Sequence, residues 1–260
     1  MTGNVWETVA DKVARDAARQ RVSTARSRLT ELHKQLDDAL HAARTHRDPN
    51  LSDEGLGNKQ RELTQRAHDT IGPQIKQLQA QVHGDADTLR RWAEDARPKV
   101  GDDATSLMRH QVAWDRVRMR LEAGMPMQQI LTTATREEAL AIREWAPAWM
   151  DAQTYNAAQH GGLSAGLYSP PDTTGLMRSI DDRLAAIEGG QVAAAIAAAR
   201  EAEVVVAGVE PIVRHLDTLA AGGQSDALGA ALESHYKAQE AAAGYQDPTE
   251  DEATRGLTHG

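Results

Sequence analysis

The chain lacks two residue types altogether and has few large aromatic side chains. Its 260 residues include no Cys and no Phe, and only four Tyr and five Trp. The absence of Cys excludes disulfides, thiolate metal sites and a cysteine nucleophile. Since only 40% of the residues are apolar, the composition favours Ala-rich helices with thin apolar seams over a thick globular core.

Long apolar runs are absent as well. The sequence has no stretch of about 18 apolar residues, and no apolar segment of the signal-peptide type lies near its start. We therefore expect no membrane span and no membrane partner. The expected location is the cytosol, or a particle that is assembled there.

The most informative pattern lies in residues 1–100. Apolar residues recur at alternating spacings of three and four over residues 22–43 and again over 75–96, where Asp85 takes one position. This spacing places a narrow apolar seam along one side of a helix, as in coiled coils. A turn-like segment, 48–55, separates the two. The sequence thus predicts an all-α fold in which a long antiparallel coiled-coil hairpin over 1–100 is followed by a smaller helical bundle.

The large apolar side chains of the seam are candidates for self-association between copies of the chain. An arm of about 45 helical residues would span roughly 65 Å, more than a compact domain of this size can cover. The predicted self-association seam comprises Val22, Leu29, Leu32, Leu36, Leu78, Val82, Leu89 and Trp92.

Four further segments follow the hairpin. Residues 101–160 are predicted as a short Trp-containing helical segment, and 161–175, rich in Gly, Ser and Pro, as a loop or linker. Residues 176–244 are expected to form a C-terminal helical bundle. The polar residues 245–260 have no apolar periodicity and are expected to form a disordered acidic tail.

The segment 101–160 has two features of interest. Helix-spaced Trp residues usually pack inward, and the alternative is that they anchor a partner at an interface. Thr-Arg-Glu-Glu at 135–138 has the spacing of a capping box and predicts a helix start. The Trp residues considered for partner binding are Trp114, Trp145 and Trp149.

Charge is divided unevenly along the chain. Residues 1–100 hold 17 Lys and Arg against 15 Asp and Glu, a balance of +2, whereas 101–260 hold 12 against 23, a balance of −11. A basic cluster from Arg15 to Lys34 is interpreted as a solvated helix face, as an attraction for the acidic half of another copy, or as a nucleic-acid-binding face. The candidates for partner binding in this cluster are Arg15, Arg19 and Arg26.

Patterns typical of catalysis and metal binding lack the required context. Gly-Leu-Ser-Ala-Gly at 162–166 matches the formula of a nucleophile elbow, but no strand is predicted before it, so a hydrolase that uses Ser164 is only a third hypothesis. His33, Asp37 and His41 are spaced by four and lack a second set of ligands. The sequence therefore predicts no catalytic residue, no metal and no cofactor.

Two phrases resemble a known class of proteins. Asp-Pro-Asn-Leu-Ser-Asp-Glu-Gly at 48–55, followed by a charged helix at 59–64, is similar to a turn in helical virion-assembly proteins of tailed bacteriophages, which are scaffold-like or minor structural proteins. Residues 124–134 and 140–147 are similar to a second phrase of such proteins. The resemblance implies a non-enzymatic structural role in head assembly, by association with itself and with a phage protein such as capsid or portal, in the host cytosol or the virion.

Overall fold

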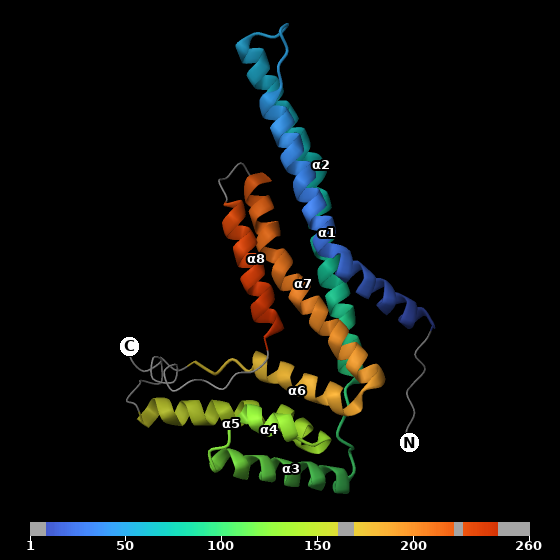
Figure 1. Ribbon diagram of the computed structural model, residues 1–260, viewed down its shortest axis with the longest axis vertical. Helices are drawn as coiled ribbons and strands as arrows, with labels where there is room; N and C mark the ends of the chain where they lie inside the picture. The colour runs from blue at the N-terminus through green and yellow to red at the C-terminus, as the bar shows by residue number, and fades with distance from the viewer. Residues whose placement is uncertain (1–8, 161–168, 221–225, 244–260) are drawn as a thin grey trace. The chain divides into compact units, whose positions relative to one another are not determined.

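The computed structural model describes residues 9–160, 169–220 and 226–243. Of these residues 87% are helical, and no strand occurs among them. The predicted all-α class is confirmed (Figure 1). The described helices are α1 (Val9–Thr45), α2 (Asp53–Ala96), α3 (Ala104–Glu122), α4 (Met127–Thr133), α5 (Arg136–His160), α6 (Thr174–Glu188), α7 (Gly190–Ala220) and α8 (Ala227–Ala242).

The chain divides into two compact units. The first combines Met1–Glu94 with Ala197–Ala242, and the second combines Asp95–Ile196 with Ala243–Gly260. The first unit therefore holds α1 and α8 with most of α2 and α7, and the second holds α3 to α6.

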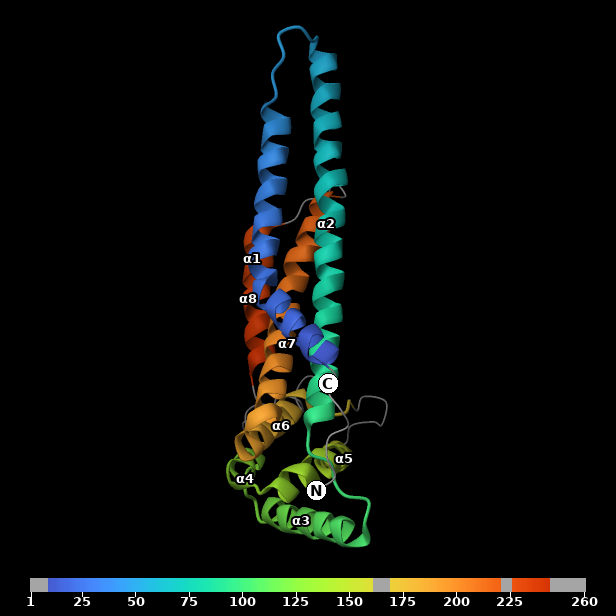
Figure 2. The ribbon, with the colours of Figure 1, turned by 90° about the vertical axis from the view of Figure 1, so that its right-hand side faces the viewer.

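In the first unit, α1 and α2 run side by side in opposite directions, and α7 lies along them in both views (Figures 1 and 2). Their shared core contains leucine, isoleucine and valine side chains from these helices. Since neither seam is wide, the hairpin buries its apolar side only with the help of a third helix. The buried core residues are Ala25, Leu29, Leu36, Leu40, Ala67, Ile71, Ile75, Leu78, Val82, Val209, Val213 and Leu216.

Short polar contacts form the turn of the hairpin. The backbone N–H of Asn50 donates to the Asp48 carboxylate at 2.9 Å, and the N–H of Gly55 donates to the Ser52 hydroxyl at 3.2 Å. Ser52 thereby caps the first turn of α2. The amide of Gln60 donates to the carbonyl of His46 at 3.1 Å and so satisfies a backbone group just beyond α1.

In the second unit, α3 to α6 enclose an aliphatic core that contains Ile130, Ile142 and Leu176. The predicted capping box is present at the start of α5. The Glu138 N–H donates to the Thr135 hydroxyl at 3.3 Å, and the Thr135 N–H donates to the Glu138 carboxylate at 3.0 Å.

A carboxylate of α6 ties this second unit together. Asp181 accepts two hydrogen bonds from Arg97 and one from Arg143 at 2.9 Å. All three side chains are largely withdrawn from water. Two guanidinium groups on one carboxylate give the unit a fixed polar connection between α5, α6 and the segment after α2.

The observed division differs from the segments predicted from the sequence. The C-terminal helices do not form a bundle of their own, because α6 packs with α4 and α5 while α8 and most of α7 belong to the unit of the hairpin. The physical reason is that the hairpin seam needs the apolar side of α7 as a cover. Most of the predicted loop 161–175 and all of the tail 245–260 lie outside the described residues.

Candidate functional site

All eight predicted seam residues belong to the apolar clusters of the first unit or pack against them. Leu32 and Trp92 are half-buried and the other six are buried. Two clusters hold the buried ones. The first contains Leu29, Leu36, Leu78 and Val82 with valines of α7, and the second contains Val22 and Leu89 with Ala198 and Ala202 of α7.

This burial bears on the use predicted for the seam. The sequence makes Val22, Leu29, Leu36 and their counterparts on α2 candidates for self-association, and it leaves open whether they pack within one chain or against a second copy. In the structure, helices of the same chain cover Val22, Leu29 and Leu36, whereas Leu32 and Leu78 also line a groove between α1 and α2. The three-four spacing indicates a narrow apolar stripe on a helix. It does not tell whether the same chain or a second chain covers this stripe.

Asp85, the carboxylate within the seam, has a specific partner on α1. The Arg21 guanidinium donates to both of its oxygens, at 2.8 and 2.6 Å, and the Asp85 side chain is only 8% exposed. The bidentate pair compensates the burial of the carboxylate, and its hydrogen bond raises the pKa of Arg21. Because both partners have one fixed geometry, the pair also sets the register of α1 against α2.

The side of the hairpin that α7 leaves uncovered holds a groove of about 510 Å³ between α1 and α2. Leu32 and Leu78 supply its apolar surface. Its other side chains are polar, and all of these are exposed: Ser27, Arg28, Glu31, Gln74, Gln77 and Gln81.

The chemistry of this groove suits another polypeptide better than a small charged ligand. Three of its side chains are glutamine amides that recur along one ridge of α2, and each can donate and accept hydrogen bonds. Arg28 and Glu31 lie about one helical turn apart on α1 and have opposite charges, so the lining has no net formal charge. An open groove with two leucines, several uncharged polar side chains and no net formal charge has the character of a helix-binding surface.

The opposite side of the hairpin contains a pair of imidazoles. The rings of His33 on α1 and His215 on α7 lie 5.7 Å apart at an angle of 70°. His215 is 4% exposed. Burial, and secondarily the neighbouring His33, lower the pKa of His215 below its usual value, while Asp226 has a smaller opposing effect. A proton on this ring is therefore disfavoured where α7 covers α1.

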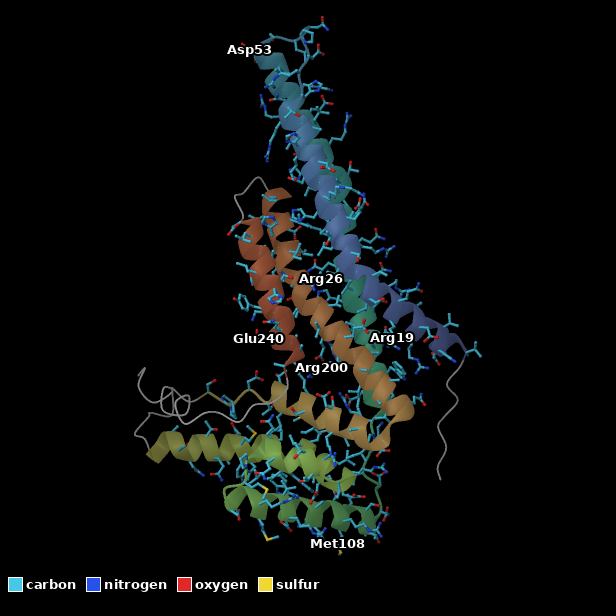
Figure 3. All side chains as sticks on the ribbon, in the orientation of Figure 1. Arg19, Arg26, Asp53, Met108, Arg200 and Glu240 are labelled. Atoms are coloured by element: carbon cyan, nitrogen blue, oxygen red, sulfur yellow. The ribbon has the colours of Figure 1, made fainter. Side chains whose placement is uncertain are left out.

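The basic residues of α1 differ in their contacts. Arg15 lies over the Trp92 ring at 4.7 Å, a cation–π contact, and Arg21 is bound to Asp85. Arg19 and Arg26 are exposed on α1 (Figure 3). The nucleic-acid hypothesis stays a prediction.

The Trp residues of the second unit belong mainly to its packing. Trp114 and Trp145 are half-buried and their rings lie 6.1 Å apart. The buried His110 lies against the Trp145 ring at 4.5 Å and forms a 2.6 Å hydrogen bond with Glu144. Trp149 is half-buried on α5. These contacts agree with the inward-packing interpretation of Trp114 and Trp145, and partner binding by the three Trp stays a prediction.

Other functional patterns receive no support from geometry. In the described ranges, no three His, Asp or Glu side chains converge in a way that would hold a metal ion. Ser164 lies outside the described residues. Among the helices of these ranges, none is both long and apolar enough to cross a membrane. No family model, curated protein or solved structure matches the chain.

Proposed function

We propose that the chain is a non-enzymatic assembly protein that binds other protein chains through the open side of its helical hairpin. The observation that carries the proposal is the groove between α1 and α2, in which the half-buried Leu32 and the buried Leu78 lie beside glutamine and serine side chains and one oppositely charged pair. A helix placed in this groove would remove apolar surface from water and meet amides that satisfy its polar groups.

The build of the hairpin supports a docking arm. Its two arms are 37 and 44 residues long and are joined by a capped turn. The bidentate Arg21–Asp85 pair and the cover by α7 hold the arms in one register, so the groove is formed before a partner arrives. A preformed surface loses little conformational entropy on binding.

The proposed setting is the assembly of a tailed-bacteriophage virion. Two segments that resemble virion-assembly proteins lie at junctions between helices: 48–55 at the hairpin turn, and 124–134 at the connection from α3 through α4. In this setting the partner is a phage structural protein such as capsid or portal, and the chain works in the host cytosol or in the virion.

A site-specific label tests the proposal. The chain has no Cys, so Gln77→Cys creates one attachment point at the groove, and Asp69→Cys creates a matched one at an exposed position of the same helix outside the groove. Each fluorescently labelled protein is mixed with the capsid and portal proteins of the same genome. We expect one of these proteins to co-sediment with the chain and to shield the label at position 77, but not at 69, from iodide quenching.

Two outcomes would contradict the proposal. In one, neither the capsid nor the portal protein binds the chain. In the other, binding leaves the label at position 77 as accessible as that at position 69, which would show that the open side of the hairpin is not the docking surface for virion proteins.

A further inference from the structure

We propose that a second copy of the chain occupies this groove, in an antiparallel dimer whose two-fold axis passes close to Gln77. The inference rests on the proposed function of the open side of the hairpin and names its first partner. It follows from the register of the two helices and from the order of side chains along each of them.

The Arg21–Asp85 pair gives the register. These residues lie opposite each other on α1 and α2. Because the helices are antiparallel and rise equally per residue, a step forward along α1 corresponds to an equal step backward along α2. The midpoint between Arg28 and Glu31 lies between eight and nine residues after Arg21. Counting the same number of residues back from Asp85 places this midpoint level with residues 76 and 77 on α2.

At this level α1 is self-complementary. A two-fold axis that crosses the helices at right angles places α1 of one copy antiparallel to α1 of the other. If the axis passes between Arg28 and Glu31, each Arg28 faces Glu31 of the other copy, and two identical ion pairs form. Both side chains are exposed at the groove, where a second copy can reach them.

The three glutamines of α2 that line the groove are also arranged symmetrically, about nearly the same level of the hairpin. Gln74 and Gln81 are centred close to Gln77, and all three line the groove. Across the axis Gln77 lies near its own copy, while Gln74 lies near Gln81. An amide can pair with an identical amide because it carries both donors and an acceptor, whereas a charged side chain on the axis would repel its copy.

The distribution of charge makes contact between two hairpins less repulsive than contact between the acidic remainders of two copies. The whole chain has a net charge of −9, so two copies repel each other on average. Residues 1–100 carry a balance of only +2, against −11 for the remainder. Two hairpins therefore meet at a small electrostatic cost, whereas the acidic remainders of two copies repel each other strongly.

Charge reversal provides a test that depends on the symmetry. Arg28→Glu places four carboxylates around the axis, and Glu31→Arg places four guanidinium groups there. We expect each variant to raise the dimer dissociation constant roughly tenfold or more, since two ion pairs become two repulsions. An equimolar mixture of the two variants restores every pair, as does the double variant Arg28→Glu/Glu31→Arg.

Sedimentation velocity of the full chain over a range of concentrations measures these constants, and circular dichroism checks that each variant is folded. Arg26→Glu is the matched control: it reverses the charge of an exposed residue of α1 that lies about 200° around the helix from Arg28. We expect its dissociation constant to stay close to that of the unchanged chain.

Two results would overturn the inference. One is a chain that stays monomeric at every concentration, and the other is a dimer that neither charge reversal weakens or that the mixture and the double variant fail to restore. If the chain alone is monomeric but a virion protein still shields a label at position 77, the inference fails while the proposed function holds. If the dimer forms and no virion protein binds, the proposed function fails while the inference holds.

Discussion

The leucines on the two sides of the hairpin differ in how they are covered. On one side α7 supplies Val209, Val213 and Leu216 and completes a closed core. On the other side Leu32 and Leu78 line a groove that no described helix of the first unit closes. The covered side contains a buried imidazole at the helix contact, whereas the open side has glutamines and one pair of opposite charges.

This difference shows where the chain supplies its own cover and where it leaves a surface. An apolar seam used only for intramolecular packing would be closed on both sides or bordered by strongly charged residues that keep other chains away. The open side is instead bordered by three glutamines and a serine beside a single pair of opposite charges. We infer that the covered side provides stability and the open side provides recognition.

The largest expected effect comes from truncating one leucine on each side. Leu29→Ala leaves a cavity in a core where Leu29 is 1% exposed, and we expect a loss of about 3 kcal/mol in the free energy of unfolding. Leu32→Ala removes a half-buried side chain of the groove and should cost less than about half of that. Urea unfolding at low protein concentration, where association does not contribute, measures both. Equal losses of unfolding free energy in the two variants would show that Leu32 is covered as fully as Leu29.

The next largest effect concerns the ion pair that sets the register. Asp85→Ala leaves Arg21 without its bidentate partner, and we expect the free energy of unfolding to fall by about 2 kcal/mol. Asp87→Ala is the control, since Asp87 forms an exposed ion pair with Arg90 on the same helix and should change stability by less than about 0.5 kcal/mol. The same urea titration applies. If the two variants behave alike, the Arg21–Asp85 pair does not hold the two arms.

The smallest effect is a dependence on pH that belongs to the covered side. The pKa of His215 is lowered in the folded chain, so the unfolded state binds a proton first as the pH falls. This contribution to stability is complete above about pH 6.5 and is lost as the pH falls through the lowered pKa. His215→Phe removes the titrating group.

We therefore expect the stability difference between pH 7.5 and pH 5.5 to be smaller in His215→Phe than in the unchanged chain. Urea unfolding at the two pH values gives the comparison, and the other histidines cancel because both proteins contain them. A larger pH dependence in the variant would contradict the assignment.

The arms of the hairpin can be predicted from the sequence because they depend on short-range patterns. The three-four spacing identifies the seam, and the Thr135–Glu138 spacing identifies the capping box of α5. Asp85 also stands out as a carboxylate in an apolar stripe, but its partner Arg21 is 64 residues away, and no local pattern connects the two.

The groove and the cover by α7 escape prediction for a related reason. α7 is rich in Ala, and its valines specify no particular partner, so nothing in this helix points to the hairpin. The groove requires the register of α1 against α2 before Arg28, Glu31 and Gln77 can be seen at one level. Such long-range relations come from packing and are absent from the periodicity of either helix.

Distances between spin labels test the central account most directly. Gln77→Cys and Asp53→Cys each give one label per chain, the first near the proposed axis and the second at the turn end of the hairpin (Figure 3). In the antiparallel dimer, the two labels at position 77 are attached to neighbouring packed helices. The distance between them is the spacing of those helices plus the lengths of the label side chains, on the order of 20 Å. Asp53 begins α2, about 24 residues before Gln77, so the labels at position 53 should be about 70 Å apart.

Double electron–electron resonance measures both distances under the same conditions. The account predicts a short distance at position 77 together with a long one at position 53. Short distances at both positions would indicate a parallel arrangement of the two hairpins. The absence of any dipolar coupling at position 77 would indicate that no second copy enters the groove. Either result contradicts the antiparallel dimer.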